Sequence, residues 1–352
     1  MANQCEQLLR LLRAEGVNVE LVRTNAPYRP AWIGRVPVLR AGARLVPFLA
    51  ELWRSIGRAE VVHVFANSGW AWHLLALPAV VMARLRGAAV IVHYHGGLAD
   101  DFLSTGPAHV RAWLARATLR VTPSAFLLRV FAKHGLEAEV IPNIIDLSRF
   151  AVASHPGRRD APHLIVTRNL EPIYDIPTAI RAFERVRRQH PAARLTVAGS
   201  GPQRAALLQL TAELGLAEAV QFSGRIDNAN IGALYASADC LLNPSTADNM
   251  PISILEALAS AVPVVSTDAG GIPDLVQHGV TALLVPVGDH EAMARQALRV
   301  LDDAVLASSL RLAGLAEVQR FAWPHVKRQW QSAYQRANHA LNAPCRSPEP
   351  AP

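Results

Sequence analysis

The most specific run of chemically capable residues lies between Asn243 and Asp274. Asp248 and Glu256 are eight positions apart, and between them stands Pro251, a residue that suits the first turn of a helix. The N–H groups of a helix start have no partner within the helix and can bind an anionic diphosphate. Glu256 would follow about one and a half turns later, where its carboxylate could accept hydrogen bonds from both hydroxyls of a ribose. The segment predicts a site for a nucleotide that carries a diphosphate.

A glycine turn provides a second, weaker signal. Gly199 and Gly201 lie in the sequence GSGP, which follows a predicted strand and opens a helix. Glycine has no Cβ, so a nucleotide could approach this backbone closely. By itself such a turn is commonplace and more often structural, and Gly199 and Gly201 are candidate donor-binding residues.

The complete segment NPSTADNMPISILEALASAVPVVSTDAGGIPD resembles the donor motif of the family 4 glycosyltransferases, which have the GT-B fold. The family carries two acidic residues eight positions apart, the first beside the donor sugar and the second beside the nucleotide ribose. The resemblance implies these roles for Asp248 and Glu256. The usual first acid is glutamate, so Asp248 keeps the charge but is one methylene shorter. The segment contributes three further donor-binding candidates, Asn249, Met250 and Pro251.

A second resemblance covers Val166 to Phe183, where many family members carry an arginine and, five residues later, a lysine that neutralise the donor diphosphate. An ungapped alignment places Asn169 and Tyr174 at those positions. The basic pair is absent from its usual register, and Arg168, one residue away, is the candidate for the charge. The alternative for Arg168 is an ordinary surface residue at a strand end, in which case main-chain N–H groups would have to bind the diphosphate.

In the first half of the chain, HYHGGLADDF resembles the place where the family presents a histidine toward the donor sugar and acceptor. The resemblance makes His95 a catalytic candidate, and Gly96 and Gly97 are acceptor-side candidates because they let the chain pass close to a substrate. His93 falls within the predicted strand and is expected to pack inside the protein.

Short apolar runs alternate with longer helical patterns along the whole chain, which predicts an α/β protein with parallel sheets covered on both faces. In the first half the predicted strands are 17–22, 61–65, 89–93, 119–122 and 139–141, and the predicted helices are 4–14, 45–56, 70–85, 107–117 and 124–133. In the second half the predicted strands are 163–167, 194–199, 219–222, 240–243, 262–267 and 282–285. The longest apolar stretch, 70–83, is shorter than the roughly 20 residues of a spanning helix and is interpreted as a buried helix.

The resemblance to the GT-B fold implies two Rossmann-like, doubly wound domains that face a central cleft, which agrees with this alternation. The first, residues 1–153, is expected on the acceptor side, and the second, residues 154–321, is expected to bind the donor. The polar, turn-rich segment 154–161 is the predicted linker. A closing helix at 322–340 is expected to pack back on the first domain, and the proline-rich end at 343–352 is expected to be disordered.

A doubly wound domain normally opens with a strand and a glycine-rich turn into its first helix. Here a helical pattern, 4–14, follows Met1 almost at once, so the first strand is missing. Two explanations are open: the start lies one element too late, or the protein has lost part of a site.

Charge and cysteine usage restrict the location and the partners. Residues 1–150 carry 17 Lys+Arg against 10 Asp+Glu, and residues 151–352 carry 18 against 18, so the whole +7 lies in the first half. An anionic membrane surface is a candidate partner, an ordinary solvated arginine-rich face explains the same pattern, and nucleic acid is disfavoured because no recognition motif accompanies the charge. Three widely spaced cysteines and no leader-like start favour a cytoplasmic protein, with peripheral attachment to the inner face of the membrane as an option.

The resemblance implies a retaining transfer of a sugar from a nucleotide-diphosphate donor to a hydroxyl on a saccharide or lipid-linked acceptor, in exopolysaccharide, envelope or glycolipid synthesis. It implies neither a metal nor a cofactor apart from the nucleotide-sugar substrate. Two alternatives stay open at this point. One is a truncated or non-catalytic relative that binds nucleotide, and the other is a GT-B nucleotide-sugar epimerase, which would act without an acceptor.

Overall fold

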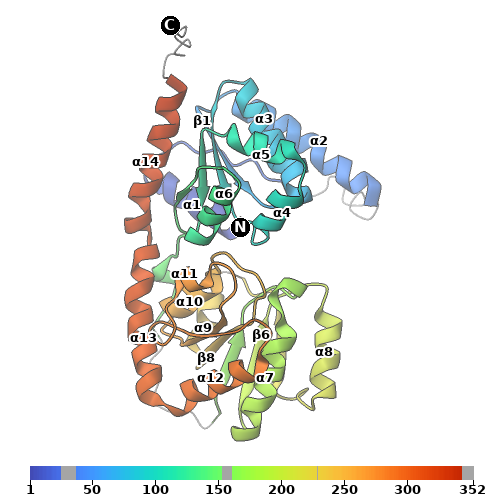
Figure 1. The fold of residues 1–352 in the computed structure, drawn as a ribbon, viewed down its shortest axis with the longest axis vertical. Helices are drawn as coiled ribbons and strands as arrows, with labels where there is room; N and C mark the ends of the chain where they lie inside the picture. The colour runs from blue at the N-terminus through green and yellow to red at the C-terminus, as the bar shows by residue number, and fades with distance from the viewer. Residues whose placement is uncertain (25–36, 153–160, 228, 343–352) are drawn as a thin grey trace. The chain divides into compact units, whose positions relative to one another are not determined.

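The computed structural model describes residues 1–24, 37–152, 161–227 and 229–342 (Figure 1). The chain forms two compact units. Unit 1 consists of Met1–Pro123, Leu127–Ile141 and the chain from Lys327 onward, and unit 2 consists of Ser124–Phe126 and Pro142–Val326. The main division falls after Ile141, before the expected boundary at 153. The predicted linker, apart from Ala161, and the predicted disordered end lie outside the described residues.

Unit 1 is built on a parallel four-stranded sheet in the order β1-β2-β3-β4. Its strands are β1 (Val61–Ala66), β2 (Ala89–Tyr94), β3 (Leu119–Thr122) and β4 (Glu139–Val140). Its helices are α1 (Ala2–Ala14), α2 (Pro37–Ile56), α3 (Leu77–Leu85), α4 (Ala99–Thr105), α5 (Ala108–Ala115), α6 (Ala125–Lys133) and the latter part of α14 (Trp323–Asn342). Every residue of β2 is buried, as expected for a central strand whose two faces are covered by helices.

The predicted strand at 17–22 is wrong. Those residues join no sheet, since β1 is the first strand of the described chain. A strand forms only where a neighbour bonds its N–H and C=O groups, and here the Arg13 guanidinium donates to the carbonyl of Val19 at 2.8 Å instead. Glu20 is held through its side chain, whose carboxylate accepts from Ser55 Oγ at 2.8 Å.

The expectation of one buried helix at 70–83 is also partly wrong. The segment begins with a π-helix, η2 (Trp72–Ala76), that continues directly into α3. Trp72 is fully buried, whereas Trp70 is 77% exposed. The apolar composition therefore predicted the helix, but it did not distinguish the buried Trp72 from the exposed Trp70. The short helix α4 was not predicted at all.

Unit 2 contains a parallel six-stranded sheet in the order β10-β9-β8-β5-β6-β7. Its strands are β5 (His163–Val166), β6 (Arg194–Ala198), β7 (Val220–Gly224), β8 (Cys240–Asn243), β9 (Val264–Thr267) and β10 (Leu283–Val285). The chain builds outward from β5 to β6 and β7, and then returns to add β8, β9 and β10 on the other side. The direction of growth reverses between β5 and β8, and ligands of doubly wound sheets bind at the carboxyl ends of the strands at such a switch point.

The helices of unit 2 cover both faces of this sheet (Figure 1). They are α7 (Ile176–Gln189), α8 (Arg204–Glu213), α9 (Ile231–Ala236), α10 (Ile252–Ala259), α11 (Ile272–Leu275), α12 (His290–Asp302), α13 (Ala304–Val318) and the start of α14. Short 3₁₀ turns lie at Leu147–Arg149, Pro172–Tyr174 and Gln319–Phe321. The facing core side chains, such as Leu164, Phe183 and Val197, are fully buried, so the ends of β5 and β8 rest on a close-packed base.

Among the described residues, no helix combines the length and the apolar composition needed to cross a bilayer.

Candidate functional site

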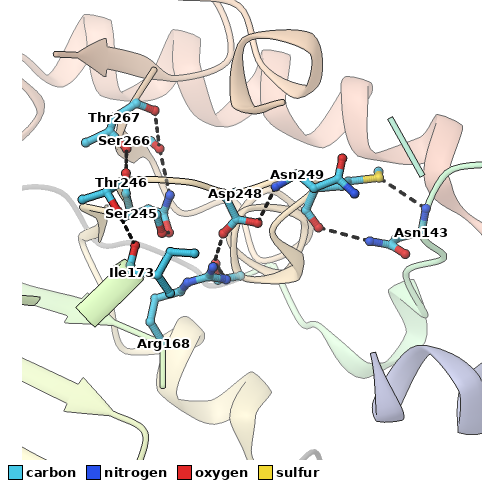
Figure 2. Close-up of polar contacts among 12 residues, drawn as sticks. Asn143, Arg168, Ile173, Ser245, Thr246, Asp248, Asn249, Ser266 and Thr267 are labelled. Atoms are coloured by element: carbon cyan, nitrogen blue, oxygen red, sulfur yellow. Dashed lines mark hydrogen bonds and ion pairs between the residues drawn. The ribbon is translucent and has the colours of Figure 1, made fainter. Parts of the chain in front are cut away.

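The switch point of unit 2 is occupied by an ion pair. Arg168 follows β5, and Asp248 lies in the loop that follows β8. A guanidinium nitrogen of Arg168 donates to a carboxylate oxygen of Asp248 (Figure 2). The two side chains are only 11% and 13% exposed. The alternative that Arg168 is an ordinary surface residue is therefore wrong.

Tyr174 fixes the other side of the guanidinium. The Arg168 Cζ atom lies 4.0 Å from the centre of the Tyr174 ring, a cation–π arrangement. Tyr174 occupies the position where the alignment expected a lysine. At this position the chain thus has an aromatic ring instead of a second positive charge. The ring attracts the Arg168 guanidinium and also orients it.

The loop that carries Asp248 is tied to its neighbours by short hydrogen bonds (Figure 2). Thr246 donates from its main chain to the Ile173 carbonyl at 2.9 Å, and Thr267 Oγ1 donates to the Ser245 carbonyl at 2.6 Å. The amide of Asn249 donates to Asp248 Oδ1 at 2.8 Å. The carboxylate is therefore held by its own loop as well as by Arg168.

Two glycines, which the sequence analysis did not single out, pack against the main chain of this loop. Gly270 has φ +56°, and a Cβ there would lie 2.1 Å from the Asp248 carbonyl oxygen. A Cβ on Gly271 would lie 2.1 Å from the Asn249 carbonyl oxygen, and the Gly271 amide donates to Asp248 O at 2.9 Å. The AGG turn is required because only glycine lets the two backbones approach so closely.

Glu256 lies in α10 with its carboxyl group enclosed by protein. The hydroxyl of Tyr235, a fully buried residue of α9, donates to Glu256 Oε2 at 3.0 Å. Burial raises the pKa of Glu256 to about 7, although the Tyr235 hydrogen bond and the charges of Arg149 and Arg168 act in the opposite direction. An ordinary surface helix would leave this side chain in water, so that alternative for Glu256 is wrong.

Tyr235 connects the two acidic positions, and the sequence analysis missed it. The Tyr235 hydroxyl oxygen also lies 3.1 Å from the Ser253 carbonyl, an alternative acceptor for its one hydrogen, and 2.7 Å from Thr167 Oγ1. Arg168 reaches the Ser253 hydroxyl at 3.5 Å. Asp248, Arg168, Ser253, Tyr235 and Glu256 thus form one connected polar network. No local motif marks Tyr235, because it belongs to a helix outside the acidic segment.

Asn249, Met250 and Pro251, which lie between Asp248 and α10, are buried, and hydrogen bonds fix the first two. The Ser124 hydroxyl donates a hydrogen bond to the side-chain amide oxygen of Asn249, and Asn143 donates from its side chain to the Met250 carbonyl at 3.1 Å. Pro251 precedes the first helical residue as the N-cap of α10, one position earlier than predicted. Its placement leaves the amides of the first helical turn at the end of the sheet.

Gly199 and Gly201 have a packing role. A Cβ at Gly199 would lie 2.0 Å from the carbonyl oxygen of Arg168, and one at Gly201 would lie 2.4 Å from that of Leu170. The Leu170 amide also donates to the Ser200 carbonyl at 3.0 Å. These glycines let their loop pack on the loop that carries Arg168, and a direct contact of either glycine with a donor stays a prediction.

In unit 1, His95 follows β2 and joins a cluster of rings. Its imidazole lies 4.1 Å from that of His93 and is stacked on Phe65 at 5.5 Å between ring centres. His93 is buried, as expected, and lies 5.5 Å from His63, which accepts or donates a 2.7 Å hydrogen bond with Tyr334 of α14. The polar atoms His63 Nε2, His95 Nε2 and both ring nitrogens of His93 are buried with no hydrogen-bond partner.

These histidines are neutral at physiological pH. Burial lowers the pKa of His63 and of His95 to about 3, and it lowers the pKa of His93 well below its ordinary value. His95 can therefore contact a sugar as a neutral imidazole but is not a proton donor in the charged form near pH 7.

Gly96 and Gly97 continue the chain past this cluster. A Cβ at Gly96 would lie 2.4 Å from Ser68 Oγ and 2.9 Å from Asn67 Oδ1. Glycine is needed here because the loops after β1 and β2 touch each other.

Within the described part of the chain, no three His, Cys, Asp or Glu side chains are grouped so that they could hold a metal ion. At the switch point of unit 2, an arginine, two carboxyl groups and helix-start amides lie together, which suits an anionic ligand with vicinal hydroxyls. A doubly wound unit with this site, preceded by a second parallel unit, defines the GT-B class of sugar transferases.

Comparisons with known proteins agree with this class. Residues 1–149 match the family described as Glycosyltransferase Family 4, and residues 161–303 match the family described as Glycosyl transferases group 1. The chain belongs to the family 4 glycosyltransferases. It is an enzyme that transfers a sugar from a nucleotide-sugar donor to an acceptor.

Individual relatives are similar over most of their length. A GDP-mannose-dependent alpha-(1-6)-phosphatidylinositol monomannoside mannosyltransferase of Mycolicibacterium smegmatis is 30% identical over 84% of this chain and 86% of its own. The glycogen synthase of Mycobacterium tuberculosis is 28% identical over 87% of this chain and 75% of its own. Both names describe transfer or synthesis, which favours these activities over epimerisation.

Solved structures share the fold at lower identity. Anabaena HepE (Alr3699), in complex with UDP and glucose, matches with a TM-score of 0.71 and 22% identity over 93% of this chain and 88% of its own. The sucrose-phosphate synthase of Thermosynechococcus elongatus matches with a TM-score of 0.69 and 21% identity over 89% of this chain and 80% of its own.

Proposed function

We propose that this enzyme transfers a hexose, with retention at the anomeric carbon, from a nucleotide-diphosphate donor bound in unit 2 to a hydroxyl of a saccharide or lipid-linked acceptor. The product would serve exopolysaccharide, envelope or glycolipid synthesis. Relatives with phosphatidylinositol mannoside and glycogen in their names support both kinds of acceptor.

The observation that carries the proposal is the network that joins Asp248, Arg168 and Glu256 across the switch point. Three groups that lie far apart in the sequence, or on different elements, converge at the one edge of the sheet where nucleotides bind in doubly wound folds. No requirement of core packing explains a charged pair and an acid of raised pKa at this place, so a ligand role accounts for them better.

Each group has a defined task in this proposal. Glu256 accepts the ribose hydroxyls, and the amides at the start of α10, after Pro251, bind the diphosphate. Arg168 shares its charge between Asp248 and the leaving diphosphate, where negative charge grows as the glycosidic bond breaks. Asp248 hydrogen bonds to hydroxyls of the donor sugar. Because these donors and acceptors are fixed before the ligand binds, little reorganisation accompanies the reaction.

Unit 1 supplies the remaining candidates. His95 would contact the reacting sugar as a neutral imidazole, and the Gly96–Gly97 turn would let an acceptor pass close to the main chain. The nucleotide-sugar is the only small molecule that the proposal requires.

Unit 1 also carries features suited to an anionic membrane surface. Val46 and Trp53 lie seven residues apart, hence on one face of α2, and are 67% and 40% exposed. The Arg86 guanidinium lies 3.9 Å from the centre of the Trp53 ring, and Leu85 beside it is 73% exposed. Exposed apolar side chains accompanied by arginines are the composition of a peripheral, interfacial attachment.

The direct test is thermal unfolding of the purified chain with UDP-, GDP-, ADP- and dTDP-hexoses, for the wild type and for an Asp248→Ala/Glu256→Ala double variant. One nucleotide class should raise the wild-type Tm, because a ligand that binds only the native state stabilises it. The shift should vanish in the double variant. Absence of any shift with all four classes would refute donor binding, and an equal shift in both proteins would refute the site.

A further inference from the structure

A row of exposed and partly exposed aromatic rings lies in unit 1, outside every residue assigned above. It consists of Trp70, His73, Phe102 and His109. Trp70 is 77% exposed although Trp72, two residues later, is fully buried. The buried tryptophan anchors the segment, so the exposed ring is presented to solvent by a fixed backbone. A single exposed apolar side chain needs no explanation, but one that ends a row of rings on three elements does.

The rings contact one another edge to face. Trp70 lies 6.1 Å from His73 between ring centres, and His73 lies 6.0 Å from Phe102 of α4 and 5.4 Å from His109 of α5. The Nε2 atom of His109 and the Nδ1 atom of His73 are 3.4 Å apart. The indole thus adjoins the His73 imidazole, which in turn adjoins that of His109, and imidazole nitrogens can donate or accept hydrogen bonds.

The row lies near the carboxyl edge of the unit 1 sheet. Trp70 opens the helical segment that follows the carboxyl end of β1 after residues 67–69, and α4 follows the carboxyl end of β2. The loop before Trp70 touches Gly96 through Asn67 and Ser68, so the row and the acceptor-side glycine turn share one edge. His73 stands in the π-helical turn η2, a distortion of helical structure that is frequent at functional sites.

We propose that this row is a binding platform for a pyranose ring of the acceptor, which makes the acceptor a saccharide or a glycan-bearing molecule. This inference rests on the proposed function, since it names the acceptor class for the same enzyme. A pyranose has one face of C–H groups and a rim of hydroxyls. Trp70 packs against the apolar face, and the ring nitrogens of His73 and His109 hydrogen bond to the hydroxyls. The two imidazoles favour a hydroxyl-rich ligand over a hydrocarbon one.

The test is direct binding of maltotriose and of α-mannotriose, measured by isothermal titration calorimetry in buffer with EDTA to exclude metal binding by the two imidazoles. Four proteins are compared: the wild type, Trp70→Ala, the double variant His73→Ala/His109→Ala, and Leu312→Ala. Leu312 is a matched control because it is a large exposed hydrophobic residue in unit 2. At least one trisaccharide should bind the wild type, Trp70→Ala should weaken it tenfold or more, and the histidine variant should weaken it severalfold. Leu312→Ala should bind as the wild type does.

The same four proteins are then tested for donor stabilisation, which separates this inference from the proposed function. Trp70→Ala should keep the full donor-induced rise in Tm, because the donor network lies in unit 2. If a saccharide binds but no donor raises the Tm, the proposed function is refuted and the binding platform stands. The platform is refuted if neither trisaccharide binds the wild type, or if Trp70→Ala binds as tightly as the wild type. It is also refuted if the part of the tryptophan emission that Trp70→Ala removes responds to phosphatidylglycerol vesicles but to neither sugar.

Discussion

At the scale of single residues, the raised pKa of Glu256 makes donor binding dependent on pH. Burial places this pKa at about 7, above its ordinary value of 4.5. The ionised carboxylate can accept from two hydroxyls, whereas the protonated acid keeps one oxygen as a donor. We expect the nucleotide Kd to fall about tenfold between pH 6 and pH 8, as the ionised fraction rises. Calorimetric titration of the stabilising nucleotide across this range measures the change.

The Glu256→Gln variant serves as the control for this prediction. It should bind the nucleotide weakly, and with little dependence on pH. An acid whose pKa is higher in the folded state than in the unfolded state favours folding most at pH values below its unfolded pKa. For Glu256 that contribution is lost as the pH rises through its folded pKa of about 7. Glu256→Gln should therefore be more stable than the wild type at pH 8, by up to about 3 kcal/mol. A variant that lost both affinity and stability would show that Glu256 is structural.

Some of these residues could be predicted from the sequence and others could not, for a physical reason. Asp248 and Glu256 were predicted because one loop and one helix set their spacing. Tyr235 was not predicted, since its contact with Glu256 depends on how α9 packs beside α10. Arg168 was a candidate, but its partner Asp248 follows β8, a strand that only the fold brings beside β5. The contact of its guanidinium with Tyr174 is local, but it depends on the 3₁₀ turn that places the ring.

At the scale of elements, the AGG turn is expected to control the position of Asp248. Gly270→Ala places a Cβ against the Asp248 carbonyl and must move the loop, so it should abolish the donor-induced rise in Tm and cost several kcal/mol. Gly288→Ala is the matched control: Gly288 also has a positive φ, +77°, but nothing lies within 4 Å of its Cβ position. It should cost only about 1 kcal/mol and keep donor binding. Equal effects of the two substitutions in urea unfolding and in donor binding would contradict this account of the turn.

The histidine cluster on β1 and β2 should make unit 1 sensitive to acid. A histidine whose pKa is lowered in the folded state contributes stability above its unfolded pKa, near 6.5, and that contribution is lost as pH falls toward 3. Each such residue removes about 1.4 kcal/mol per pH unit over that window.

His93→Leu tests this expectation. The substitution removes two buried ring nitrogens without partners, so it should leave the protein at least as stable at pH 7.5 and reduce the loss of stability between pH 6.5 and pH 5. Urea unfolding at several pH values gives both numbers. An unchanged pH slope would show that His93 does not share in the acid sensitivity.

Alternation of apolar runs and helical patterns predicted most of the strands in both units, because parallel strands covered on two faces need such runs. The strand expected at 17–22 failed because it has no neighbour in the described sheet. The helix α4 was missed because its seven residues, ADDFLST, include too few apolar positions for a recognisable period.

At the scale of the whole molecule, the charge asymmetry predicts attachment to anionic bilayers. All of the net charge of +7 comes from the first 150 residues. The wild type should sediment with vesicles that contain phosphatidylglycerol at low salt and should be released by about 0.5 M NaCl, where charges are screened within a few ångströms. Trp53→Ser/Leu85→Ser should weaken this association. Val305→Ser, which alters a side chain 81% exposed in unit 2, should not.

A result in which the vesicles never bind, or in which Val305→Ser weakens binding as much as the double variant, would favour an ordinary solvated arginine-rich face on unit 1 instead.

The central claim is that the donor binds at the switch point of unit 2. Amide hydrogen exchange with and without the saturating nucleotide-sugar tests it most directly, because it reports the site without relying on a substitution. We predict slower exchange in the donor-bound enzyme at residues 167–170, in the loop after β5, and at residues 249–256, which comprise the end of the Asp248 loop and the start of α10. Protection confined to other segments, with these two segments unchanged, would contradict the assignment.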